Sequence, residues 1–142
     1  MKKSLVAVLV LVFGLAGAAS AELNMRDGNW ESTIEMTIEG LPFAMPPMSF
    51  TNTKCMTKKD AVPSTASKDQ KCEVKEQSVT GSTVHWKVVC KDKNGTSEGT
   101  GEITYSGTGY RGTMKLKTTD AKGQTTTSKA KLSGRRTGDC PK

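Results

Sequence analysis

The chain has 142 residues and a formal net charge of +7, and 35% of its residues are hydrophobic while only 5% are aromatic. This length suits a single domain, and the apolar content disfavours wholesale disorder. With one histidine, His85, and no recognisable nucleophile motif, the composition argues against most hydrolase chemistry. We therefore expect a protein that is not an enzyme and that needs no cofactor.

The first 21 residues have the features of a secretory signal peptide. Two lysines precede an apolar run over residues 5–18, and Ala19-Ser20-Ala21 supplies the small side chains that signal peptidase reads. We expect cleavage before Glu22 and a periplasmic or secreted domain over residues 22–142, with no transmembrane segment. The apolar run is shorter than the ~20 residues of a membrane-spanning helix, although an uncleaved anchor is the alternative.

Residues 30–38 alternate between apolar and polar side chains, with Ser32 as an exception. Trp30, Ile34 and Met36 fall on one face, and glutamates and threonines fall on the other. A period of two predicts a strand with one buried and one wet face.

The next segment, GLPFAMPPMSF at residues 40–50, holds three of the five prolines. Proline lacks a backbone donor, so an ordered loop or a sheet edge is expected here. A short strand should follow at 50–56. A helical turn is predicted at 57–62, because Thr57 and Asp60 are placed to cap it and Pro63 ends it.

A β-hairpin is predicted about Gly81, with strands over 72–79 and 83–90 joined by Thr80-Gly81-Ser82. Folding the chain about Gly81 sets Val74 opposite Val88, Glu76 opposite Trp86, and Cys72 opposite Cys90. Directly opposed side chains lie near disulfide reach. Because four cysteines in an exported chain favour disulfides, we predict Cys72–Cys90, which leaves Cys55–Cys140.

Three further strands are expected toward the C-terminus, the first over residues 97–105. In the second, Tyr110, Met114 and Leu116 share a face, and in the third, Ala130 and Leu132 point inward. The predicted fold is all-β: an antiparallel meander of about seven strands, a curved sheet or a barrel-like one, with one short helical turn and two disulfides.

Six segments stand out in their order along the chain: Gly28-Asn29-Trp30, GLPFAMPPMSF, Cys55-Met56-Thr57, the 86–90 stretch WKVVC, GTGEITYSG at 99–107 and SGRRTGDC at 133–140. Together they resemble the DUF3617 family of small exported bacterial proteins. The resemblance covers nearly the whole mature chain and implies export, a β-rich domain and two disulfides. Because the family's function is unknown, it implies no catalytic or ligand-binding residues.

The proline-rich segment is too apolar for a free loop. It either folds over an open end of the sheet as a lid, which we favour, or exposes a patch for a partner. We expect a binding module that holds an apolar or amphipathic small molecule, or an envelope component, on the concave side of the sheet. The candidate ligand-binding residues are Trp30, Phe43, Met45, Met48, Trp86, Tyr105 and Tyr110.

Two other functions remain open. Met36, Met45, Met48 and Met56 crowd the N-terminal third, and thioethers select Cu(I), so a copper-handling protein is one alternative. Methionines also fill gaps in apolar cores, and we favour that explanation and expect no metal site. The other alternative is a structural or partner-binding envelope protein without a pocket.

Charge is distributed unevenly. Residues 108–142 have a net charge of +7 and residues 22–107 a net charge of −2. A basic surface is predicted over two adjacent strands, made of Arg111, Lys115, Lys117, Lys129 and Lys131. It could meet anionic head groups or polysaccharide, or be a solvated face that protects strand edges. It could also pair with Glu31, Glu35 and Glu39 if the first and last strands are neighbours. Nucleic acid is not an expected partner.

Overall fold

The computed structural model describes residues 22–63 and 70–142, which form a single seven-stranded antiparallel sheet. The strands are β1 (Gly28–Glu39), β2 (Met48–Met56), β3 (Lys71–Thr80), β4 (Thr83–Asp92), β5 (Gly95–Tyr105), β6 (Gly109–Asp120) and β7 (Thr125–Gly138). A 3₁₀ turn, η1 (Lys58–Asp60), follows β2. The predicted signal peptide, residues 1–21, lies outside the described residues. Within the described part, no helix is long and apolar enough to span a membrane.

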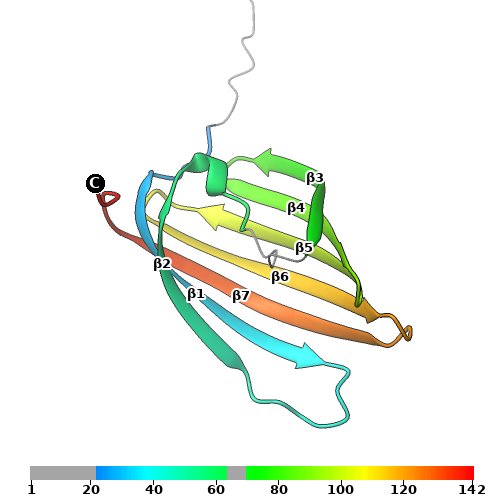
Figure 1. The fold of residues 1–142 in the computed structure, drawn as a ribbon. Coiled ribbons are helices and arrows are strands. Elements are labelled where there is room, and N and C mark those ends of the chain that lie inside the picture. Colours follow the sequence, from blue (N-terminus) through cyan, green and yellow to red (C-terminus); the bar gives the residue numbers. More distant parts are fainter. Residues whose placement is uncertain (1–21, 64–69) are drawn as a thin grey trace, which may run out of the picture.

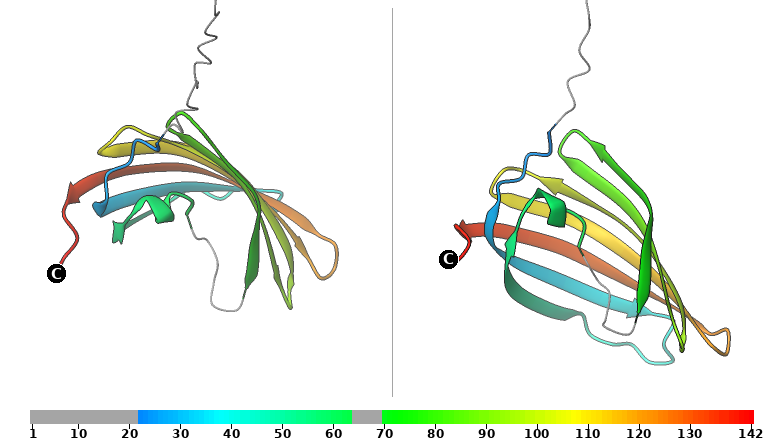
Figure 2. Two further views of the ribbon diagram at one scale, coloured as in Figure 1. Left: turned by 90° about the horizontal axis from the view of Figure 1, so that it is seen from above. Right: turned by 45° about the horizontal axis from the view of Figure 1, so that its top comes forward.

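The strand order is β2-β1-β7-β6-β5-β4-β3 (Figure 1). A meander therefore runs from β3 to β7, and the hairpin of β1 and β2 adds to its β7 edge. The sheet bends into an open arch, and η1 lies on its hollow side (Figure 2). The predicted all-β fold with seven strands is confirmed, and the curved sheet remains open.

Strand alternation divides the sheet into two faces. The hollow face carries Val84, Trp86 and Val88 of β4, and the polar face carries His85 and Lys87 of the same strand. The face that carries Tyr105 is the one that lines the hollow. The Tyr105 hydroxyl donates a hydrogen bond (2.8 Å) to the carbonyl oxygen of Ala61, which follows η1 on the hollow side (Figure 2). The amphipathic pattern of each strand thus decides which face covers the core.

The core on the hollow face is built by aromatic rings packed together. Trp30 lies edge-on to Tyr105 with ring centroids 6.3 Å apart, and Tyr110 lies 5.8 Å from Trp30 and 5.4 Å from Tyr105. Such contacts add to the free energy gained by burying the rings. Glycine makes room for these rings, since a Cβ on Gly134 would lie 2.1 Å from the ring of Tyr110. The large rings therefore fill the arch without a second sheet.

The segment after β2 is fixed by a local cap, as predicted. The Asp60 carboxylate accepts hydrogen bonds from the backbone N–H (2.9 Å) and the hydroxyl (3.1 Å) of Thr57. The bond from the Thr57 backbone is the main cause that holds the pKa of Asp60 below its usual range. This cap sets the path of the chain as Ala61 enters the core.

The hairpin of β3 and β4 follows the prediction in part. The connection is a two-residue loop, Gly81-Ser82, so Glu76 pairs with Lys87 and the predicted pairing of Glu76 with Trp86 is wrong. A β-bulge at Lys75 adds one residue to β3 and restores the predicted register beyond it. Cys72 is therefore opposite Cys90, and these two cysteines form a disulfide.

Cys55 and Cys140 form the second disulfide, with their Cα atoms 5.3 Å apart. It ties the end of β2, an edge strand, to the residue that follows β7 by two positions. Both predicted disulfides are thus confirmed.

Candidate functional site

The hollow face carries exposed apolar side chains at both edges of the sheet, interspersed with polar ones such as Asn52 and Lys54 of β2. Phe50 of β2 is 55% exposed, and Val74 and Val79 of β3 are 49% and 47% exposed. All three lie on the hollow face, since their directly opposed partners are Ile34, Val88 and Val84. The exposure of these three side chains was not predicted, because periodicity shows which face a residue takes but not which strands form the edges of the sheet.

The four aromatic residues predicted to bind a ligand lie in the core. Trp30, Tyr105, Tyr110 and Trp86 are between 0% and 8% exposed. Burial is the main cause that raises the pKa of Tyr105 and of Tyr110, so both phenols are neutral at physiological pH. Three of these rings pack on one another, so this part of the hollow face is filled rather than lined by a ligand cavity.

The proline-rich loop after β1 presents an exposed aromatic ring. Phe43 is 64% exposed, so this side chain does not fold back over the sheet and the lid interpretation is wrong for it. Met45 is half-buried in the same loop. Met48 begins β2 and lies directly opposite Met36 on the hollow face. The loop is drawn at the end of the β1–β2 hairpin that lies away from η1 (Figure 1).

Two further methionines of the N-terminal third, Met25 and Met56, do not gather with this pair. Met25 is 2% exposed in the core, and Met56 lies at the opposite end of β2. Over residues 22–63 and 70–142, no three His, Cys, Asp or Glu side chains are placed to hold a metal ion. The structure places two thioethers opposite each other, and copper handling stays a prediction.

The predicted basic surface lies on the polar face of β6 and β7. Lys115 is directly opposite Lys129, while Arg111 is opposite Ser133. β1 is the other neighbour of β7. This is the arrangement in which Glu31, Glu35 and Glu39 were expected to pair with the basic surface. Two ion pairs link these strands, Lys129 with Glu39 (2.7 Å) and Arg135 with Glu31 (2.9 Å). Part of the basic charge is therefore neutralised within the sheet.

A shallow groove of about 660 Å³ crosses four strands next to these lysines. Its lining residues come in runs of three, 35–37, 129–131, 113–115 and 100–102, together with Pro47. The outer two residues of each run point to the polar face. Gly101 is the middle residue of one run, and the ring of Trp86 covers it on the hollow side. Because Gly101 is nevertheless part-exposed, its exposed surface lies on the polar face. The groove is therefore open to the polar face.

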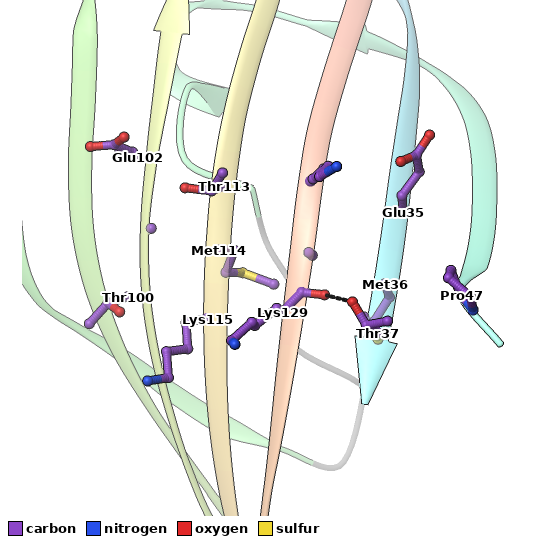
Figure 3. A pocket seen from close by; sticks show the side chains of 13 residues that line it. Glu35, Met36, Thr37, Pro47, Thr100, Glu102, Thr113, Met114, Lys115 and Lys129 are labelled. Atoms are coloured by element: carbon purple, nitrogen blue, oxygen red, sulfur yellow. Dashed lines mark hydrogen bonds between the residues drawn. The ribbon is translucent and has the colours of Figure 1, made fainter. Parts of the chain in front are cut away.

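Figure 3 shows the side chains around this groove, with Lys115 and Lys129 side by side on neighbouring strands. Glu102 and Glu35 lie toward its two sides, on β5 and β1. A smaller cavity of about 270 Å³ shares Thr100 with the groove and reaches His85 on β4. A third cavity, of about 520 Å³, lies around Met25, Lys58 and Arg136.

His85 lies on the polar face beside a carboxylate. Its Nδ1 atom is 3.4 Å from the carboxylate of Glu102, and both side chains are about half exposed. This pair is a surface contact at the margin of the groove.

Comparison with known proteins gives a family match. A family model described as "Protein of unknown function (DUF3617)" matches residues 25–140. No curated protein and no solved structure matched the chain.

Proposed function

Because this chain belongs to the DUF3617 family, whose description assigns no function, we propose a function from its geometry: an exported, non-enzymatic module that binds an amphipathic small molecule on the hollow face of its sheet. The alkyl part of the ligand would lie against the apolar edges of the arch. Its polar part would face the solvent at the open side.

The observation that carries this proposal is where the exposed apolar side chains lie. Four large hydrophobic side chains are exposed in the described residues, and three of them, Phe50, Val74 and Val79, lie on the hollow face of the two edge strands. The fourth is Phe43, in the loop next to β2. Exposed apolar surface that is gathered on one face marks a binding site more often than scattered surface residues do.

The aromatic cluster that fills one end of the hollow face restricts where a ligand can lie. The aromatic cluster is closed by η1 and Ala61 at one end of the arch, so the ligand would not replace its rings. It would instead cover the apolar side chains of the edge strands. Open edges are also a hazard for aggregation, and a bound ligand would shield Val74 and Val79 of β3 from other chains.

Export is supported by two observations. The chain carries two disulfides, which persist in oxidising compartments, and its first 21 residues match a signal peptide in sequence. The ligand would therefore be an envelope component or an extracellular amphiphile.

The test is calorimetric titration of the oxidised protein with laurate, a single-chain amphiphile. Val74→Thr combined with Val79→Thr should weaken binding about fivefold, because hydroxyl groups replace apolar contact area. Val89→Thr is the matched control, since Val89 lies on the polar face of β4, opposite Glu98 and Glu73. Equal losses in both variants, or no binding by the parent protein, would refute the proposal.

A further inference from the structure

A groove lies on the opposite face of the sheet, across β5, β6, β7 and β1. We propose that this groove binds a soluble phosphorylated sugar, with the phosphate held by Lys115, Lys129 and Lys131. The inference is independent of the proposed function, because the groove opens to the polar face and the apolar edge residues line the hollow face.

The first step concerns the cations. Lys115 and Lys129 are directly opposite each other on neighbouring strands, and like charges in that arrangement repel. Lys129 has one anionic partner, Glu39. Among the described residues, neither Lys115 nor Lys131 forms an ion pair. An anion between these ammonium groups would remove the repulsion.

The second step concerns hydroxyl groups in the same place. Thr113 lies on the polar face between Lys131 of β7 and Glu102 of β5, with which it is in direct register. Thr100 is in register with Lys115. Lysines supply strong charge-assisted hydrogen bonds to phosphate oxygens, and a threonine hydroxyl adds a neutral donor. This set suits a phosphate group better than a carboxylate, since a phosphate offers more acceptor oxygens.

The third step concerns the carboxylates at the two sides of the groove. Glu102 and Glu35 line it on β5 and β1, and ionised carboxylates only accept hydrogen bonds. A ligand that is purely anionic would be repelled by them. A ligand with hydroxyl groups beside its phosphate would donate hydrogen bonds to the carboxylate on that side. The combination of cations at the centre and acceptors at the sides therefore indicates a phosphorylated polyol such as a sugar phosphate.

The size of the groove agrees with a small ligand. Its volume of about 660 Å³ lies within the range of roughly 300–1,000 Å³ that is usual for small-molecule sites. The floor is main chain, because Gly101 and Ala130 have little or no side chain and face the hollow side.

Calorimetric titration of the full protein with both disulfides intact tests this proposal. The probes are glucose 1-phosphate, inorganic phosphate and glucose. Glucose 1-phosphate should bind about tenfold more tightly than inorganic phosphate, because only the sugar supplies hydroxyl groups that donate to a carboxylate at the side of the groove. Glucose alone should show no binding. Equal affinity for the two phosphates would refute the sugar-binding part, and no binding of either would refute the site.

Matched lysine variants separate a defined site from general basic charge. Lys115→Gln and Lys131→Gln should each weaken binding of glucose 1-phosphate about tenfold. Lys117→Gln is the control, because Lys117 lies on the same strand and the same face as Lys115 but does not line the groove. An equal loss in the Lys117 variant would overturn the proposal, since it would show that only the net charge matters.

Discussion

Cys72 and Cys90 lie directly opposite each other on β3 and β4, with their Cα atoms 4.0 Å apart, and are joined by a disulfide. The bond closes a short segment, with a sequence separation of 18. The Cys55–Cys140 bond spans 85 residues and joins β2 to the C-terminal end of the chain. The two bonds therefore constrain the unfolded chain to different degrees.

Removing a disulfide should destabilise the protein more when the bond closes a longer segment, and the effect grows with the logarithm of that length. Replacing Cys72 and Cys90 by Ser should lower the free energy of unfolding by about 3 kcal/mol, and replacing Cys55 and Cys140 by about 4.5 kcal/mol. Denaturant unfolding of both variants measures the difference. A larger loss from the Cys72–Cys90 pair would contradict this order.

Gly101 should not tolerate a methyl group. A Cβ at this position would lie 2.4 Å from the ring of Trp86, which covers it on the hollow face. Gly101→Ala should therefore displace the ring and cost about 1–3 kcal/mol of unfolding free energy, measured by thermal or denaturant unfolding. Gly138→Ala is the control, because nothing lies within 4 Å of its Cβ position and a change below about 0.5 kcal/mol is expected. Equal effects of the two variants would mean that the ring does not rest on Gly101.

The cap formed by Asp60 should contribute stability that depends on pH. Its pKa is lowered in the folded protein, chiefly by the hydrogen bond from the Thr57 backbone. The contribution is thus present above the unfolded value of about 4 and is lost as the pH falls through the folded value. Asp60→Asn should reduce stability by about 0.5–1 kcal/mol at neutral pH and flatten the acid limb of the stability curve. The exposed Glu98→Gln, which removes no hydrogen bond of the cap, is the control for stability at neutral pH. An unaltered acid limb in Asp60→Asn would argue against the cap.

Tyr105 should stabilise the protein through its hydroxyl group. Tyr105→Phe removes the hydrogen bond to Ala61 and leaves that carbonyl oxygen without its partner, at a cost of about 1–3 kcal/mol. Circular dichroism during denaturant unfolding would measure the loss. A neutral effect would show that the segment after η1 is not held by this bond.

The two tyrosines should also ionise late. Burial is the main cause that raises the pKa of both Tyr105 and Tyr110 above the usual value near 10. Because the folded pKa values are raised, the two neutral phenols contribute to the stability of the folded protein at neutral pH. This contribution is lost as the pH rises above about 10. Phenolate absorbance should therefore stay low until the protein unfolds in base. A normal titration of either tyrosine at pH 10 in the folded state would contradict its burial.

The β3–β4 hairpin shows how far sequence reasoning could go. Alternation predicted the faces of Val84, Trp86 and Val88, and the Cys72–Cys90 disulfide was predicted from the hairpin register about Gly81. The loop is one residue shorter than predicted, which would have put every β3 side chain on the wrong face. The bulge at Lys75 restores the predicted pairing for the part of β3 that precedes it, which includes Val74 and Cys72. No pattern in the sequence indicates a bulge there.

Alternation predicted the faces of the candidate site residues but not which of them are exposed at a sheet edge. The basic residues Lys115 and Lys129 were placed on one face correctly, because both belong to clearly alternating strands. The exposure of Phe50 and Val79 was not foreseen, since it follows from the position of β2 and β3 at the edges of the sheet. The order of strands is a property of long-range pairing, and a local pattern does not specify it.

The most direct test of ligand binding on the hollow face is methyl NMR of valine-labelled protein during titration with laurate. The account predicts that the resonances of Val74 and Val79 shift in proportion to bound laurate, while those of Val89, on the polar face, stay unchanged. Shifts at Val89 alone, or equal shifts on both faces, would contradict it.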